Sequence, residues 1–508
     1  MGVLDEKYYF KKISDDRASG VLMHISSLPG PYGIGSLGRK AREFADFLEA
    51  AGQKYWQLLP VGPTSYGDSP YQSFSTFAGN PYFIDLEELM ELGLISREEV
   101  EEIVHVDDET RIDYGRLYYE RFKVLRLAFE RFNQEDEDFK AFSMEKALWL
   151  DDYAMFMAIK DNFEGKSWIS WPDEYKYRNS DALERFVVEH EKEINFHKFL
   201  QFMFFKQWRA LKDYLSEKNI KTIGDLPIYV AEDSSDVWVN PELFQLKDDL
   251  TCAFVGGCPP DDFSDVGQLW GNPVYDWDKN EETGFKWWLD RLGASFEIFD
   301  CLRLDHFRGF ESYWSIPAGD EDAKQGSWQP GPSMKLFSKV KEKYGDLPII
   351  AEDLGFITEE VYNFRIETGY PSMKILQFAF NPDGSSEHIP HNFDDNNIVY
   401  VGTHDNETME GWFSNALPHE IEYARDYFNL THEEGYTWGV IRGAMTSVAR
   451  TSIIQMQDLL CLDNSARMNL PNSLGENWKW RMREGAIDQG LIERFKKLTR
   501  MTNRLNKQ

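Results

Sequence analysis

Short apolar runs that end in polar residues recur along the chain. Eight such runs lie near residues 20, 55, 221, 300, 347, 373, 397 and 452. Helix-like segments of about a dozen residues, such as GPSMKLFSKVKEKYG and TEEVYNFRIETG, separate the later runs. This alternation predicts an α/β fold, a single (β/α)8 TIM barrel over residues 1–508, with its chemistry at the carboxyl ends of the strands.

Two long stretches interrupt the alternation. Residues 85–220, between the second and third runs, are far too many for one crossover helix. Phe122, Leu125 and Phe129 step through this stretch at helical intervals, so it is predicted to be a mostly helical insertion after barrel strand 2. Residues 231–290 are rich in Gly, Pro, Trp and Asp, which predicts a loop-rich insertion after strand 3 that covers the barrel mouth.

Charge and composition narrow the possible ligands. The net charge of −32 would repel nucleic acid and anionic membranes, so neither is expected as a partner. Aromatic residues make up 15% of the chain, and their rings pack on the apolar faces of sugars as well as in cores. A neutral ligand fits this surface best.

The cysteines and the amino-terminal residues indicate the cellular compartment in which the protein is expected. The sequence begins without an apolar run of the secretory type, and no later segment is a long uncharged apolar stretch. Four cysteines are too few for a disulfide framework, and the spacing of Cys252 and Cys258 is not that of a zinc knuckle. A reduced, cytoplasmic protein is expected.

Charged residues gather where the strands end. In LRLDHFRGF, alternation along a strand places Arg303 and Asp305 on one face. An arginine keeps a neighbouring carboxylate ionised and oriented, as a nucleophile requires, although such pairs are more often structural. Glu352 ends the next run after three apolar residues, which favours a raised pKa and a general-acid role. His404 and Asp405 end another run.

Three carboxylates at one barrel mouth match the needs of glycoside chemistry. That chemistry uses a nucleophile, an acid/base and a group that stabilises developing positive charge. A retaining mechanism requires the first two about 5 Å apart, a separation that neighbouring barrel strands provide.

Long motifs identify a resemblance that runs nearly end to end. The chain resembles the 4-α-glucanotransferases, the amylomaltase or disproportionating enzyme family related to the α-amylases. The matching motifs are SSLPGPYGIGSLG, GDSPYQSFSTFAGNPYFIDL, GDLPIYVAEDSSDVW, GGCPPDDFSDVGQLWGNPVYDW, RLDHFRGF, IIAEDLG, GTHDNET and ARMNLPNSLGENWKWR. The resemblance implies Asp305 as the nucleophile, Glu352 as the acid/base and Asp405 as the stabiliser of the transition state, with Arg303 and His404 beside them.

The resemblance also implies the sugar contacts and the substrates. It places Tyr71 and Asp225 at the cleavage point, with Ser69 and Gln72 nearby. Taken alone, Tyr71 is equally a core residue, and Asp225 is equally a cap for the segment that follows. The implied substrates are α-1,4-glucans (maltooligosaccharides, starch or glycogen fragments) and glucose, with no cofactor and no metal. The oligomeric state is left open.

The segment 256–277 carries both a departure and an expectation. Cys258 and Asp262 differ from the residues usual in the family, which makes this loop's role as a lid less certain. Gly256 and Gly257 are candidate hinges for such a lid. Trp270 offers aromatic surface to an acceptor sugar or, equally, packs the loop onto the barrel.

Other functions use parts of the same pattern. An α-amylase-like retaining hydrolase shares all three carboxylates and differs in whether water or a sugar hydroxyl attacks the intermediate. A metal-dependent barrel hydrolase is less favoured, because His24, His306 and His404 include no His-x-His pair. A non-catalytic glucan-binding protein would not require all three carboxylates at strand ends.

Overall fold

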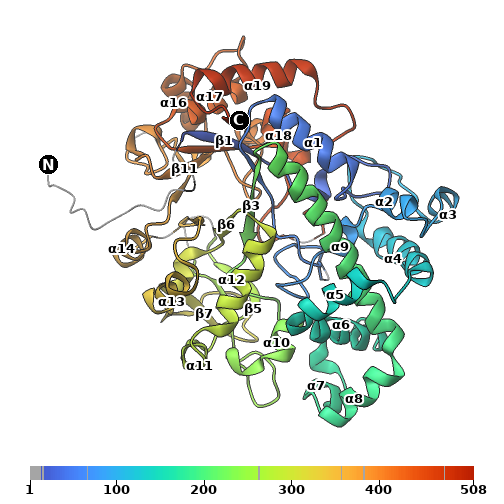
Figure 1. Cartoon of the computed structure of the whole chain (residues 1–508). Coiled ribbons are helices and arrows are strands. Elements are labelled where there is room, and N and C mark those ends of the chain that lie inside the picture. Colours follow the sequence, from blue (N-terminus) through green and yellow to red (C-terminus); the bar gives the residue numbers. More distant parts are fainter. Residues whose placement is uncertain are drawn as a thin grey trace.

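Eight parallel strands close into a barrel in the order β1-β12-β11-β10-β9-β6-β3-β2 (Figure 1). The computed structural model describes residues 13, 16–65, 67–260, 264–355, 357–381, 384–473 and 475–507. The barrel strands are β1 (Ala18–Leu22), β2 (Tyr55–Gln57), β3 (Lys221–Leu226), β6 (Cys301–Leu304), β9 (Ile349–Ala351), β10 (Ser372–Ile375), β11 (Asn397–Tyr400) and β12 (Thr451–Gln455). Each apolar run of the sequence supplies one strand, which confirms the predicted fold class.

Helices outside the barrel cover its strands (Figure 1). Helix α1 shows why: Ala41, Phe44, Ala45 and Leu48 are buried at helical spacing and face the barrel. The other helices around the barrel are α12 (Lys286–Ile298), α13 (Met334–Tyr344), α14 (Glu359–Thr368), α15 (Met409–Asn415), α16 (Pro418–Phe428), α17 (Tyr436–Thr446), α18 (Met456–Leu459) and α19 (Gln489–Met501), with α1 at Arg39–Ala50. None of the helices in the described ranges is long and apolar enough to cross a membrane.

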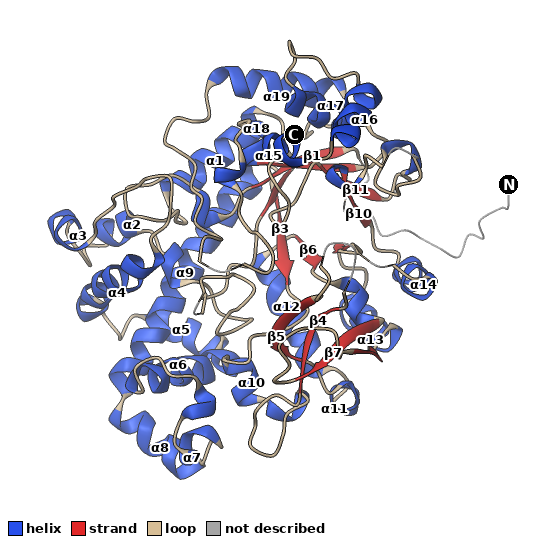
Figure 2. Ribbon diagram, turned by 180° about the vertical axis from the view of Figure 1, so that it is seen from behind, coloured by secondary structure: helices blue, strands red, loops and turns tan. Residues whose placement is uncertain are grey.

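The chain between β2 and β3 folds into a group of helices on one side of the barrel (Figure 2). These helices are α2 (Leu86–Glu91), α3 (Arg97–Ile103), α4 (Tyr114–Arg131), α5 (Glu137–Glu145), α6 (Ala147–Asn162), α7 (Asp173–Lys176), α8 (Ser180–Glu189) and α9 (Glu191–Glu217). Aromatic rings hold them together, for example Phe132 and Phe199 with ring centroids 4.9 Å apart. Helix α9 contacts α6 within the group and α1 on the barrel, and so joins the two.

A second sheet, which the sequence analysis did not predict, lies beside the barrel (Figure 2). Its antiparallel strands, in the order β5-β4-β7-β8, are β4 (Phe254–Cys258), β5 (Gln268–Pro273), β7 (Ser312–Pro317) and β8 (Ser327–Pro330). Residues 231–290 therefore contain two strands, together with α10 (Ser235–Val239), α11 (Trp277–Glu282) and the start of α12. This is more regular structure than a loop-rich composition predicts.

The expectation that Gly256 and Gly257 form a hinge is wrong. Both lie inside β4, which pairs with β5 on one side and β7 on the other. A Cβ atom on Gly256 would lie 2.5 Å from the Tyr229 ring, and one on Gly257 would lie 2.1 Å from the carbonyl oxygen of Gln268. Glycine is needed here for close packing. Asp262 lies outside the described residues.

A buried arginine lies on the floor of the barrel, at the amino-terminal ends of β1 and β12. Arg504 is wholly buried and donates hydrogen bonds to the carbonyl oxygens of Ala18 and Arg450, which flank the starts of β1 and β12, at 2.9 and 2.8 Å. It also donates to the carbonyls of Met445 and Ala449 at 2.8 and 2.7 Å. Arg504 thus joins the segment after α19 to the starts of β1 and β12.

Candidate active site at the barrel mouth

One buried arginine holds two carboxylates at the mouth. Asp225 in β3 lies directly opposite Arg303 in β6, and Asp305 follows the end of β6. Arg303 Nη1 lies 2.7 Å from both oxygens of Asp225 and 3.0 Å from Asp305 Oδ1. Arg303 is 3% exposed, so these charge-assisted contacts form largely out of water, where they are strong.

Tyr71 and His404 extend this network to the third carboxylate. The Tyr71 hydroxyl donates to Asp225 Oδ2 at 2.8 Å and lies 2.8 Å from His404 Nε2. Because the hydroxyl has one proton, which Asp225 accepts, His404 Nε2 must be the donor to Tyr71. His404 Nε2 also lies 3.2 Å from Asp405 Oδ2. A continuous set of hydrogen bonds and ion-pair contacts therefore joins Asp305 to Asp405.

Glu352 lies just after β9 and is held by backbone groups. Its Oε2 accepts the His306 N–H at 2.6 Å, and its Oε1 accepts the Leu354 N–H at 3.3 Å. His306 has a left-handed backbone with φ of 50°, a conformation that is costly outside glycine. Burial raises the pKa of Glu352 to about 8; Arg303 opposes this shift and the charge of Asp305 adds to it.

The other two carboxylates have different environments. Burial raises the pKa of Asp305 to about 6, against the opposing charge of Arg303 and with the help of Asp225 and Asp405. For Asp405, burial again acts to raise the pKa, but His404 and a hydrogen bond from Asn469 outweigh it and hold the pKa well below its usual range. Three carboxylates thus have three separate affinities for protons, the condition for dividing acid and base roles.

The network opens into a cleft of about 300 Å³. Of the predicted site residues, those that line it are Asp305, Asp405, His404, Tyr71, Ser69, Gln72 and Trp270. Ser69 Oγ accepts the Tyr71 N–H at 3.2 Å, and Gln72 Nε2 donates to Asn272 Oδ1 in β5 at 2.8 Å. The Trp270 ring meets the His306 ring edge-to-face at 4.8 Å, which brings Trp270 next to the peptide that holds Glu352.

Comparison with known proteins decides the family. A family model of 4-alpha-glucanotransferases matches residues 23–487. The chain belongs to the 4-alpha-glucanotransferase family. It is 54% identical to a 4-alpha-glucanotransferase from Clostridium butyricum, over 95% of this chain and 100% of that protein. It is 45% identical to one from Thermus thermophilus, over 96% of this chain and 99% of that protein.

A solved structure agrees with this membership. The amylomaltase from Streptococcus agalactiae, in complex with acarbose, matches with a TM-score of 0.94 at 45% identity, over 96% of this chain and 100% of that chain. Both the sequence and the whole barrel with its insertions are therefore those of the 4-alpha-glucanotransferase family. The α-amylase-like hydrolase is not favoured, and neither is a metal-dependent hydrolase or a non-catalytic binding protein.

Sequence reasoning missed several residues of this family member's cleft. Asn469 and Trp478 both line the cleft, and Asn469 Nδ2 donates to Asp405 Oδ1 at 2.6 Å. Both belong to the motif ARMNLPNSLGENWKWR, which the analysis recognised without selecting any residue from it. The motif has neither strand nor helix periodicity, so nothing in its pattern shows which side chains face the cleft.

The described part of the chain contains no group of three His, Cys, Asp or Glu side chains that could hold a metal ion. Burial lowers the pKa of both His24 and His306 to about 3, so both imidazoles are neutral. Their rings pack against aromatic side chains: His24 against Phe83 and His306 against Trp270, with ring centroids 5.3 and 4.8 Å apart.

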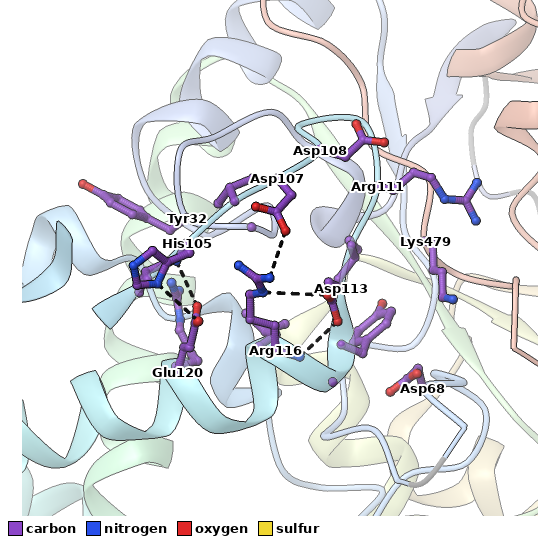
Figure 3. A pocket seen from close by; sticks show the side chains of 18 of the residues that line it. Tyr32, Asp68, His105, Asp107, Asp108, Arg111, Asp113, Arg116, Glu120 and Lys479 are labelled. Carbon is purple, nitrogen blue, oxygen red and sulfur yellow. Dashed lines mark hydrogen bonds and ion pairs between the residues drawn. The ribbon is translucent and has the colours of Figure 1, made fainter. Parts of the chain in front are cut away.

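A second cavity has a volume of about 450 Å³, and Figure 3 shows side chains that line it. Ion pairs cross it, such as Arg116 with Asp107 at 2.9 Å. Neighbouring residues divide between the two spaces: Asp68 and Glu476 line the cavity, whereas Ser69 and Asn477 line the cleft. None of the ten predicted site residues lines the cavity, whereas Asp305 and Asp405 line the cleft.

Proposed function

We propose that the chain cleaves an α-1,4-glucan, holds the donor segment on Asp305, and passes it to the 4-hydroxyl of a second glucan or of glucose. Family membership establishes the 4-α-glucanotransferase activity. One observation supports the finer mechanism: three carboxylates with three different pKa values meet at one barrel mouth.

In the first half-reaction, an oxygen of ionised Asp305 attacks the anomeric carbon of the donor. The bond from that carbon to the leaving 4-oxygen breaks, and protonated Glu352 gives its proton to that oxygen. Arg303 binds Asp305 Oδ1 and orients the carboxylate for the attack. The product is a glycosyl ester on Asp305, with inverted configuration.

In the second half-reaction, Glu352 is the base. It takes the proton of the acceptor's 4-hydroxyl, whose oxygen attacks the anomeric carbon and displaces Asp305. Two inversions give net retention. Asp405, ionised at any pH near neutrality, stabilises the positive charge that develops on the sugar ring in both steps.

Transfer requires that an acceptor sugar reaches the ester before water does. Trp270 lies in the cleft beside the His306 peptide that binds Glu352, which suits it to carry an acceptor ring next to the base. The segment 256–277 is the proposed shield against water.

Maltooligosaccharides, starch or glycogen fragments are the proposed donors, and these or glucose the acceptors. The Streptococcus agalactiae amylomaltase, which matches this chain in fold and sequence, binds acarbose. The cytoplasm is the proposed compartment.

One incubation tests the proposal. Maltotriose alone should give glucose and a ladder of longer oligomers with little gain in reducing ends, because each broken bond is replaced. Reducing ends released in step with substrate loss, with no longer oligomers, would instead support the α-amylase-like alternative.

A further inference from the structure

We infer that Arg467 is a positioning residue for the transfer reaction, holding Asp405 and Asn469 in place from behind the cleft. The inference rests on the role proposed above for Asp405. Arg467 lies in the segment between β12 and α19, which carries the motif ARMNLPNSLGENWKWR. It does not itself line the cleft, so any effect it has on the reaction passes through its neighbours.

The Arg467 guanidinium bridges two segments that are far apart in sequence. Its Nη2 donates to the carbonyl oxygen of Asp405 at 2.6 Å, and its Nε donates to the carbonyl oxygen of Asn469 at 2.8 Å. The first carbonyl belongs to the loop between β11 and α15, and the second to the segment between α18 and α19. A planar guanidinium presents two donors in a fixed arrangement, so it sets the separation of both loops at once.

The two loops are also bonded to each other on the cleft side. The Asn469 N–H donates to the carbonyl oxygen of His404 at 3.1 Å, and its side-chain amide donates to Asp405 Oδ1 at 2.6 Å. Asn469 therefore aligns the Asp405 carboxylate directly, and Arg467 fixes the peptide from which Asn469 reaches it.

Asp405 requires such support more than Asp305 does. Its side chain is 41% exposed, against 26% for Asp305, and it lies on a loop between β11 and α15. A group on a loop that stabilises charge must be held within a fraction of an ångström of its working position. Burial lowers the pKa of Arg467, and Glu407 and Asp405 act against this shift. Arginine stays protonated in proteins, so the guanidinium is a cationic donor.

The competing explanation is that Arg467 merely stabilises the fold, as an arginine bonded to backbone carbonyls often does. Arg504 is the matched control, because it is also bonded to backbone carbonyls but lies on the barrel floor. If both arginines are purely structural, their loss should have the same kind of effect.

The experiment compares R467M, R467K, N469A, the double variant R467M/N469A and the control R504M. The measurements are kcat and KM with maltotriose, together with the thermal midpoint Tm. We expect R467M to lower kcat about 10- to 100-fold with KM changed less than about threefold, because a misplaced group costs rate more than ground-state binding. R467K, which retains one cationic donor, should recover part of the loss. R504M should lower Tm and leave kcat unchanged.

The double variant decides whether Arg467 acts through Asn469. If it does, R467M/N469A should have a kcat within about threefold of the lower single variant, since both changes disturb the same carboxylate. The inference would be overturned if the fold-loss of kcat in the double variant equalled the product of the two single losses. A wild-type kcat in R467M would also overturn it. If R467M does not fold, R467K and R467K/N469A provide the same cycle.

A further variant separates this inference from the proposed mechanism. Near-normal turnover in D405N would remove the proposed role of Asp405 itself. An inactive D405N with an unaffected R467M would leave the mechanism standing and refute only the positioning role.

Discussion

Two buried arginines mark the opposite ends of the barrel, and their partners differ. Arg504 on the floor donates to neutral backbone carbonyls, and burial lowers its pKa to about 9. Arg303 at the mouth binds Asp225 and Asp305, which raise its pKa well above the usual range despite its burial. On the floor, Arg504 satisfies backbone carbonyls with hydrogen bonds. At the mouth, Arg303 instead influences the protonation of the reactive carboxylates.

The carboxylates at the mouth lower the stability of the fold, and the proposed reaction depends on them. A buried carboxylate with a raised pKa is more costly to ionise in the folded chain than in the unfolded chain. Asp305 and Glu352 are both in this position. At pH values where Asp305 and Glu352 are ionised, the fold should therefore be less stable than the same shape with neutral residues at these two positions.

The largest expected effect comes from neutralising the mouth. D305N and E352Q should each lower kcat by about 10⁴-fold or more, because each removes a role that no neighbour can assume. Neither should lower Tm at neutral pH, and E352Q should raise it. The measurements are transfer from maltotriose, in preparations checked for wild-type contamination, and calorimetry.

The stability gain has a defined pH dependence. The pKa of Glu352 is raised in the folded chain, so the folded state binds more protons than the unfolded state between the two pKa values, and its stability falls as pH rises through that range. The Tm advantage of E352Q should therefore be small at pH 5 and grow toward pH 8. Normal transfer rates in either variant would reassign the site.

The activity of the unaltered chain should follow pH in a bell. The value of kcat/KM should rise as Asp305 loses its proton near pH 6 and fall as Glu352 loses its proton near pH 8. The two groups interact, so the two limbs belong to the pair. A profile that is level from pH 5 to 9 would contradict the proposed division of roles.

Removing the arginine on the floor should affect stability alone. R504M should destabilise the fold by about 3 kcal/mol, because it removes the hydrogen bonds that the buried guanidinium donates to several backbone carbonyls. Its kcat at 25 °C should equal that of the unaltered chain. R500M, at an exposed position in the last turn of α19, four residues before Arg504, is the control and should leave Tm unchanged. A loss of kcat in R504M would show that floor and mouth are coupled.

The barrel and its carboxylates can be predicted from the sequence for a simple physical reason. Barrel strands are buried on both faces, so each is an apolar run, and the polar residues that follow lie at the mouth. Asp305, Glu352 and Asp405 are all found in this way. Each belongs to a local pattern that a few neighbouring residues define.

The second sheet and the role of Asn469 cannot be predicted from the sequence in the same way. Strand β4 pairs Phe254 with Pro317, about sixty positions away in the chain, and its two glycines look like loop residues until their tight contacts are seen. Asn469 acts from an irregular segment whose conformation depends on Arg467 and His404. Such residues are defined by contacts between distant segments, which no local pattern contains.

The smallest expected effect is none at all, and it tests what supplies positive charge at the mouth. Exhaustive EDTA treatment and dialysis should leave transfer from maltotriose unchanged. Asp305 and Glu352 provide the nucleophile and the acid, and Arg303 provides the fixed cation that in other sites a metal ion supplies. Its three contacts of 2.7 to 3.0 Å with Asp225 and Asp305 leave those carboxylates committed to a guanidinium. Complete inactivation, reversed by one divalent ion, would mean that Arg303 does not supply enough positive charge for the reaction. A metal ion, and not Arg303, would then be the cation that distinguishes the mouth from the floor.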